Sequence, residues 1–147
     1  MKTIRLILKQ KGQVIWSASP DMTVFEALKI MANKDVGALP VLDNDKLVGI
    51  FSERDYARKV ILKGKASKQT AVREIMSTHL VTVTPGQTSE QGLALMTVKR
   101  VRHLPVLEDQ VFIGIISIGD LVKSIMEEQK QVIDKLEQHI LEKTGLN

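Results

Sequence analysis

The chain contains an internal repeat that covers most of its length. Residues 20–61 and 85–126 align without a gap, and 14 of the 42 aligned positions are identical. The identical positions include a Leu-Pro-Val-Leu segment, which occurs at 39–42 and again at 104–107. Self-similarity at one fixed period indicates a structural unit used twice, and a single such unit cannot cover its own apolar face. The repeat therefore predicts two similar halves that pack together.

Each copy shows the same succession of hydrophobic periods. Apolar residues three and four apart follow Thr-x-x-Glu at 23–26 and Thr-x-x-Gln at 88–91, which is typical of an amphipathic helix with a capping box. Two β-rich runs around an acidic turn then indicate a hairpin. The expected elements are strands at 13–18 and 80–84, first helices at 23–34 and 88–99, hairpins at 37–52 and 102–117, and second helices that begin at Ser52 and Ser117. The expected fold is α/β (α+β), with two β-α-β-β-α units.

Three segments lie outside the two units. An alternating run at 3–8 predicts an extra N-terminal strand, 63–71 reads as a polar connector, and the C-terminal residues predict a long helix. The expected division is an N-terminal extension at 1–13, a first unit at 14–64, a connector at 65–78, a second unit at 79–128 and a helical tail at 129–147.

Composition limits the possible chemistry. A chain of 147 residues with 44% apolar residues suits one compact domain or two small halves that share a core. Because there is no cysteine, disulfides, a thiol nucleophile and sulfur-held zinc are excluded. The sequence shows neither a signal peptide nor a membrane span, so we expect a cytoplasmic protein. The formal net charge of +4 is mild and is compatible with phosphate-bearing ligands or with an ordinary solvated surface.

Both copies end in a Gly-apolar-apolar-Ser-x-x-Asp segment, at 49–55 and 114–120. One interpretation is a capping box, which needs no ligand. The other is a ligand-binding site that occurs in both copies. A serine hydroxyl, backbone N–H groups and a carboxylate at a helix start can bind phosphate and ribose. The first helices vary between Glu26 and Gln91 at the capping position, whereas the second helices keep Asp in both copies. This favours a ligand role without excluding the cap.

The duplicated unit resembles the CBS domain, and the tandem pair resembles a Bateman module. The resemblance rests on Leu-Pro-Val in the middle strand and on the Gly-apolar-apolar-Ser-x-x-Asp segment before the final helix, and it covers residues 14 to 128. It implies two units related by pseudo-twofold symmetry, with two clefts. It also implies a regulatory function through an adenosine-containing ligand such as AMP, ADP, ATP, NAD(H) or S-adenosylmethionine, in the manner of an energy or redox sensor.

The resemblance assigns roles to particular residues. Asp55 and Asp120 would hold ribose hydroxyls, and Ser52 and Ser117 would lie at the phosphate or the ribose. The residues expected to border the adenine are Val36, Gly37 and Ala38 in the first copy, Val101, Arg102 and His103 in the second, and Ile50 and Ile115.

The two copies differ beside the Leu-Pro-Val segment. The second copy has Arg102 and His103 there, and the first has Gly37 and Ala38, so the clefts should not be equivalent. A guanidinium can grip phosphate through two hydrogen bonds, although an arginine is more commonly an exposed charge. The phosphate candidates, in order of expectation, are Arg102, Arg54 and Arg58.

Other function classes have less support. No histidine spacing suggests a metal site and no nucleophilic triad is evident, so we expect neither an enzyme nor a bound metal. Nucleic-acid binding is not expected either, since aromatic residues make up only 3% of the chain. A ligand-free structural module is the main alternative. The lysines at 63, 65 and 68 could form a mobile flap over a phosphate or simply a solvated linker.

The tail predicts self-association. Residues 122, 126, 129, 133, 136 and 140 follow one another at spacings of four, three, four, three and four, which places them on one helix face. The alternatives are a homodimer built partly by this helix and a helix folded back on its own module.

Overall fold

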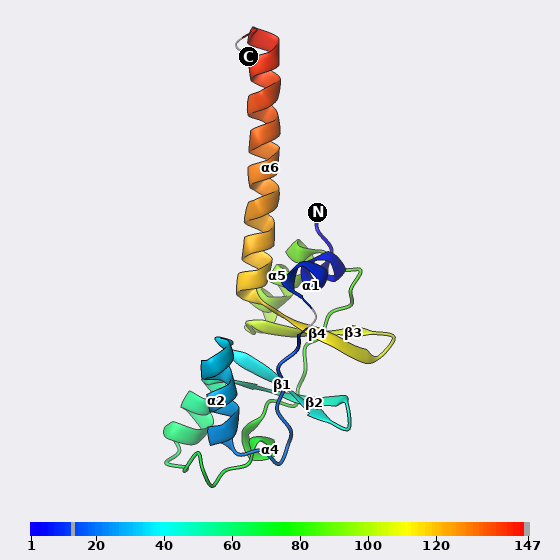
Figure 1. The fold of residues 1–147 in the computed structure, drawn as a ribbon. Helices are drawn as coiled ribbons and strands as arrows, with labels where there is room; N and C mark the ends of the chain where they lie inside the picture. Colours follow the sequence, from blue (N-terminus) through cyan, green and yellow to red (C-terminus); the bar gives the residue numbers. More distant parts are fainter. Residues whose placement is uncertain (13, 146–147) are drawn as a thin grey trace.

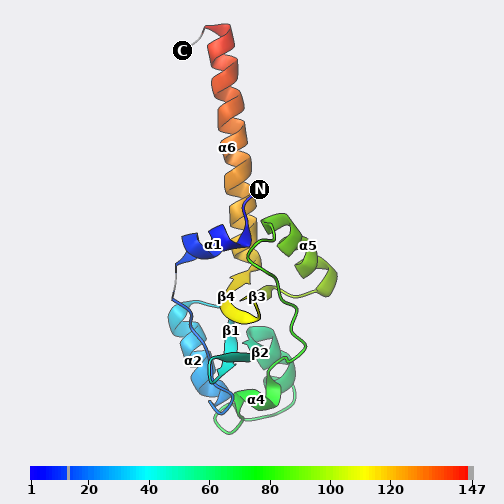
Figure 2. The same ribbon diagram turned by 90° about the vertical axis from the view of Figure 1, so that its right-hand side faces the viewer.

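A computed structural model describes residues 1–12 and 14–145. Two units of similar build lie one above the other, and a long helix projects from the second of them (Figures 1 and 2). In chain order the elements are α1 (Ile4–Lys11), α2 (Val24–Lys34), β1 (Ala38–Asp43), β2 (Lys46–Ser52), α3 (Glu53–Tyr56), η1 (Ala57–Ile61), α4 (Val72–Ile75), α5 (Ser89–Lys99), β3 (His103–Glu108), β4 (Val111–Ser117) and α6 (Ile118–Thr144). The mixed α/β class predicted from the sequence is confirmed.

The repeat folds into two antiparallel hairpins with the same register. Val41 lies opposite Gly49 in the first hairpin, and Val106 lies opposite Gly114 in the second, with an irregularity in register at the next residue. Both two-residue turns adopt left-handed backbone conformations, at Asn44–Asp45 and Asp109–Gln110. Such turns suit the right-handed twist of the strands, so the hairpins predicted around acidic turns are confirmed.

The prediction of an N-terminal strand at 3–8 is wrong, because these residues lie in α1 and its cap. Thr3 Oγ1 accepts a hydrogen bond from Leu6 N at 3.3 Å, which caps the helix. Ile4 and Ile7 are buried in the second unit. Apolar residues in this run are spaced by three as well as by two positions. A short apolar run of this kind is compatible with either a helix or a strand.

The strands predicted at 13–18 and 80–84 are reduced to single bridges. Ala18 pairs with Val41, and Val83 pairs with Val106, in parallel orientation. Pro20 and Pro85 follow two residues later, and the chain then enters the first helices. Because proline cannot donate a hydrogen bond to a sheet, only one residue in each copy pairs with the edge of the hairpin. Gln13, the first residue of the earlier predicted strand, lies outside the described part of the chain.

Each unit has a hydrophobic core of its own. The first core contains Phe51, Leu39 and Val41, and α4 packs on it through Val72 and Ile75. The second core includes Leu104, Val106, Ile116 and Leu121 from its own unit and Ile4 and Ile7 from α1. The chain therefore begins on the second unit, crosses to the first, and returns.

The C-terminal helix is confirmed, and it projects away from both units (Figure 1). Leu121 and Ser124 are its buried residues, and every described residue from 129 onward is exposed. The alternative of a helix folded back on its module does not describe this structure.

Candidate functional site

The two Ser-x-x-Asp segments form capping boxes. In the first, Ser52 Oγ accepts from Asp55 N at 3.1 Å, and Asp55 Oδ2 accepts from Ser52 N at 3.0 Å. In the second, Ser117 and Asp120 make the same two bonds at 3.1 and 2.9 Å. The capping interpretation is therefore correct. In each copy the capping bonds use only one of the two carboxylate oxygens of the Asp.

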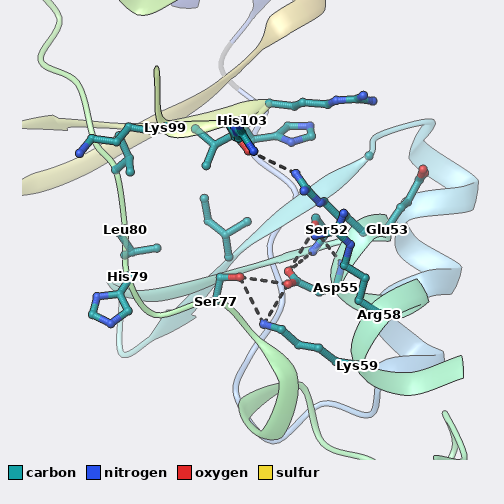
Figure 3. A pocket seen from close by; sticks show the side chains of 17 residues that line it. Ser52, Glu53, Asp55, Arg58, Lys59, Ser77, His79, Leu80, Lys99 and His103 are labelled. Atoms are coloured by element: carbon teal, nitrogen blue, oxygen red, sulfur yellow. Dashed lines mark hydrogen bonds and ion pairs between the residues drawn. The ribbon is translucent and has the colours of Figure 1, made fainter. Parts of the chain in front are cut away.

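Asp55 carries three further interactions on its cleft side (Figure 3). Its Oδ1 accepts from Ser77 Oγ at 3.0 Å and lies 3.0 Å from Lys59 Nζ, while Oδ2 also accepts from Ser52 Oγ at 3.0 Å. Lys59 stands one turn after Asp55, in the π-helical segment η1. Single π-helical turns are frequently found at functional sites. Here one accompanies a lysine that points at the repeated carboxylate.

A cavity of about 960 Å³, which we call cleft one, lies between the two units. Its size falls in the range of small-molecule sites. The first unit contributes Gly37, Ile50, Ser52, Glu53, Arg54, Asp55, Arg58 and Lys59. The second contributes His79, Leu80, Val81, Lys99, Arg100, Val101, Arg102 and His103, and Ser77 comes from the chain between them. Cleft one therefore combines the Ser-x-x-Asp segment of one copy with the Arg102–His103 pair of the other.

The two units are linked directly at this cleft. Arg54 Nη1 donates to Arg100 O at 3.2 Å. Arg100 ends α5 in a left-handed conformation, with φ of 56°, and this turns its carbonyl out of the helix.

Within each unit, the start of the second helix is bonded to the residue before the hairpin. Glu53 N donates to Gly37 O at 3.1 Å, and Ile118 N donates to Arg102 O at 2.9 Å. Both helix starts are thus tied to the residue that precedes the hairpin.

The positive charge of the molecule is concentrated at cleft one. Six Lys and Arg against two Asp and Glu line it, a net of +4. The formal net charge of the entire chain is also +4. The remaining residues carry no net charge together. Arg5 and Lys11, which line a second cavity, are paired with Glu108 and Asp120, so cleft one is where the excess positive charge attracts an anion.

His103 is the titratable residue of cleft one with a shifted pKa. Burial lowers the pKa of His103 below its ordinary value, the charges of Lys11 and Arg102 lower it further, and Asp120 acts in the opposite direction. The imidazole is therefore neutral at pH 7. A neutral imidazole can both donate and accept a hydrogen bond, and a nearby phosphate would favour its protonation.

A second cavity of about 430 Å³, which we call cleft two, is smaller and more apolar. Leu8, Trp16, Ile113 and Ile115 are among its lining residues, together with three cationic residues of α1. One of these, Lys11, donates to Asp120 Oδ2 at 2.8 Å. Burial acts to raise the pKa of Asp120, but hydrogen bonds from Lys11 and Ser117 outweigh it, and the pKa lies below its usual range.

The structure divides the sequence-predicted residues unequally. Cleft one holds Gly37, Ile50, Ser52, Arg54, Asp55, Arg58, Val101, Arg102 and His103; cleft two holds Val36, Ala38 and Ile115; and Ser117 and Asp120 line neither. None of the three lysines of the connector lines cleft one, and Lys68 instead lies over the Phe25 ring at 4.8 Å.

Sequence reasoning missed several lining residues. Lys59 follows Asp55 at a spacing of four on a helix, so this pair was open to prediction. Lys99 and Arg100 also precede the Arg102–His103 segment closely. Lys11 is more than 100 residues from Asp120, and no sequence pattern indicated that pair.

Two other kinds of site were sought. Within residues 1–12 and 14–145, no group of His, Asp and Glu side chains could hold a metal ion. The same residues include no helix that is long and apolar enough to cross a membrane.

Comparison with known proteins identifies the family. The family model of the CBS domain matches residues 13–62 and 72–127. The chain belongs to the CBS-domain family. The two matched segments make it a tandem CBS pair, as the repeat predicted.

Relatives with the same architecture come from several organisms. The mitochondrial CBS domain-containing protein CBSX3 of Arabidopsis thaliana is 39% identical over 148 residues, which cover 94% of this chain and 71% of that protein. A CBS-domain protein of Burkholderia ambifaria, described as a candidate signal-transduction protein, has a solved structure. It is 47% identical, with a TM-score of 0.83 over 87% of this chain and 96% of that one. The CBS domain pair of protein MJ0100 was solved with 5′-methylthioadenosine and S-adenosylmethionine; at 22% identity and a TM-score of 0.75, over 87% of this chain and 98% of that one, it shows the shared fold.

Proposed function

We propose that this CBS pair is a regulatory module that binds a phosphate-bearing adenosine ligand in cleft one. The observation that supports the proposal most is the charge of cleft one, whose lining carries a net of +4. A cavity with this charge between low-dielectric walls concentrates anions. The ligand-free structural module, the main alternative, gives no reason for the cationic side chains to gather there.

The roles of the residues follow from their chemistry. Asp55 can accept hydrogen bonds from ribose hydroxyls once Lys59 and Ser77 turn away from its Oδ1. Lys59 lines the same cleft, so its ammonium can move from Asp55 to a phosphate and remain paired. Arg102 is the foremost phosphate ligand, because its side chain is exposed to the cavity from the opposite unit.

The same charge argues for a choice among adenosine ligands. AMP, ADP, ATP and NAD(H) are anions, whereas S-adenosylmethionine carries a sulfonium and an ammonium group against one carboxylate. Like charges in a partly desolvated cleft repel. The ligands of the MJ0100 pair therefore need not be the ligands of this chain.

The direct test is a calorimetric titration of the purified protein with adenosine, AMP, ATP, NADH and S-adenosylmethionine. We expect affinity to rise from adenosine to AMP to ATP, and to fall with added salt because the phosphate contacts are electrostatic. Binding of S-adenosylmethionine more tightly than ATP, or of none of the five, would contradict the proposal. The second outcome would favour a purely structural module.

We also propose that two copies associate through α6. Met126, Ile133, Leu136 and Ile140 are each more than 50% exposed and lie on one face of the projecting helix. In proteins most of the stability of a helix comes from packing its apolar face, and nothing among the described residues packs on this one. The heptad spacing makes the stripe complementary to itself, which is what a symmetric pair of identical helices requires.

Substitutions on and off the stripe test this association. Ile133→Glu with Leu136→Glu should shift the wild-type dimer to monomer in sedimentation equilibrium. Gln131→Glu with Gln138→Glu adds the same charge on the outer face and should leave the dimer intact. A wild-type protein that is monomeric at tens of micromolar, a concentration in the range of weak dimers, would contradict the proposal.

A further inference from the structure

The two repeated aspartates are each paired with a lysine, but the lysines come from different parts of the chain. Lys59 follows Asp55 by four residues in the first unit, and the 65-residue repeat places Ser124 at the equivalent position of the second. Ser124 is buried, and its hydroxyl has no hydrogen-bond partner among the described residues. The second unit therefore lacks the local lysine, and Lys11 of α1 contacts Asp120 instead.

Helix α1 is fixed firmly to the second unit. Ile4 N donates to Gln87 O at 2.8 Å, and Arg5 N donates to Pro85 O at 3.0 Å. Ile4 and Ile7 are buried in the second core. Lys11 is therefore carried by an anchored helix that packs on the second unit, as Figure 2 shows for α1.

The equivalent segment of the first unit runs differently. The bridges Thr3–Thr88 and Thr23–Ala71 occupy equivalent positions, so the segment that begins at Ala71 is the counterpart of α1. Its helix, α4, has only four residues, whereas α1 has eight. After α4 the chain becomes extended, and Ser77 exchanges two backbone hydrogen bonds with Ile50, at 2.8 and 3.0 Å.

The longer helix covers the second site. A methyl group at Gly114 would lie 2.8 Å from Leu8 Cδ2, so Leu8 fills the space directly over that strand. One turn later, Lys11 Nζ donates both to Asp120 Oδ2, at 2.8 Å, and to Ile115 O, at 3.1 Å. A ligand that used Asp120 Oδ2 would have to displace the Lys11 ammonium.

From this we infer that Lys11 is a specificity-determining residue that closes the second adenosine site, so that each chain binds one nucleotide. The inference rests on the proposed function for cleft one. In that cleft Lys59 likewise donates to a backbone carbonyl, Ile75 O, at 3.1 Å, but it lines a cavity of about 960 Å³ and can move to a phosphate there. In cleft two the chain itself supplies the partner of the carboxylate, and the remaining cavity of about 430 Å³ excludes Ser117 and Asp120 from its wall.

Calorimetric titration with ATP and with adenosine tests the inference in three proteins. The wild type should bind one molecule per chain. Lys11→Ala should bind two, because Asp120 and Ile115 O become available. Lys9→Ala is the matched control, since Lys9 stands on the same helix and lines the same cavity but does not contact Asp120, and it should bind one.

Comparing the number of ligands bound per chain in Lys11→Ala and in the wild type distinguishes a failure of this inference from a failure of the proposal for cleft one. If the stoichiometry of Lys11→Ala equals that of the wild type, whatever that value is, Lys11 does not close the site. If the wild type already binds two molecules, cleft two is open and the inference fails. An amide NMR titration of the wild type with ATP gives a second readout: Ser52 and Asp55 should shift, and Leu8 and Gly12, which line cleft two, should not. Shifts at the latter pair would overturn the inference even if Lys11→Ala proved unstable.

Discussion

The two halves of this CBS pair keep the same helix start and use it in different surroundings. Ser52–Asp55 and Ser117–Asp120 make the same capping bonds within 0.1 Å of each other. Asp55 lines a large cationic cavity, whereas Asp120 lines neither cavity and is paired with Lys11 of α1. A duplicated motif therefore preserves what local folding needs, and its functional use is decided by the segment that packs across it.

The difference depends on the cross-over of the chain. The segment before each unit packs on the other unit, so α1 belongs structurally to the second half and α4 to the first. Lengthening one of these helices by a turn changes one cleft without altering the repeated segments. Sequence differences in the segments that precede the two repeated units are thus enough to give the two clefts different sizes and linings.

The largest effect expected is the loss of ligand binding in Asp55→Ala. The substitution removes the carboxylate that accepts ribose hydroxyls, and we expect no measurable heat with ATP. Asp120→Ala is the matched control from the other half and should change the affinity less than twofold, because cleft two is closed. Each substitution removes one half of a capping box, at a cost of about 1 kcal/mol. Asp55→Ala also removes the bonds from Ser77 and Lys59 and should be the less stable variant, and thermal melts should show that both proteins are folded.

Equal losses of ATP affinity in the two aspartate variants would contradict the difference between the two clefts. Unchanged affinity in both variants would show that the Ser-x-x-Asp segments are not part of the ligand site. Asp55→Asn, which preserves the shape of the cap, separates loss of the carboxylate charge from loss of the helix start.

The next effect in size concerns Arg102. Arg102→Ala should weaken AMP and ATP by roughly 1.5–3 kcal/mol, the usual value of a hydrogen bond to a charged group. Adenosine, which has no phosphate, should bind as before. Arg73→Ala removes an exposed arginine paired with Asp21 outside both clefts and is the control. An equal loss for adenosine and AMP would mean that Arg102 has no phosphate role.

A third comparison concerns the glycines opposite the repeated valines, Val41 and Val106. A methyl group at Gly49 would lie 2.7 Å from Met76 Sδ and 3.0 Å from the backbone oxygen of Ser77, whereas at Gly114 it would meet only the flexible end of Leu8. Gly49→Ala should therefore cost about 1–3 kcal/mol of folding free energy, as overpacking does, and Gly114→Ala less. Urea denaturation measures both. A larger cost at Gly114 would show that α1 is the more rigid cover.

The smallest effect expected is a pH dependence from His103. Its pKa in the folded protein is below the ordinary 6.5, so the unfolded chain binds the proton more readily. The free energy of unfolding should thus be fully retained above pH 6.5 and should fall as the pH drops from 6.5 through the folded pKa.

Comparing His103→Gln with the wild type isolates this contribution from those of the other histidines. The variant should show a flatter pH dependence of unfolding by urea between about pH 5 and 8. A phosphate beside His103 should raise its pKa, so ATP binding to wild type should take up protons near pH 6, the region in which histidine titrates. The same slope in both proteins would show that burial and the charges of Lys11 and Arg102 do not lower the pKa of His103.

The sequence predicted most of the fold because the repeat supplied two independent copies of each local pattern. Helices with threonine caps and hairpins with acidic turns depend on neighbouring residues, and these predictions are confirmed. The N-terminal segment failed because Ile4, Leu6 and Leu8 alternate while Ile4, Ile7 and Leu8 also follow a helical period. Packing on the second core selects the helix, and a single copy of the pattern could not reveal that.

The candidate site was only partly open to prediction. Asp55, Ser52 and Arg102 were named from the motif and from the difference between the copies, and the structure brings them to one cavity. That Arg102 of the second copy faces Asp55 of the first depends on how the units pack. The Lys11–Asp120 pair depends on the crossing of the N-terminal helix, which no local pattern records.

A structure of the protein crystallised with ATP tests the central claim most directly. The account predicts one nucleotide per chain in cleft one, with the ribose on Asp55, the phosphates beside Arg102 and Lys59, and Lys11 still within hydrogen-bond distance of Asp120. A nucleotide in cleft two with Lys11 displaced from Asp120, or phosphates that lie away from Arg102, would contradict it.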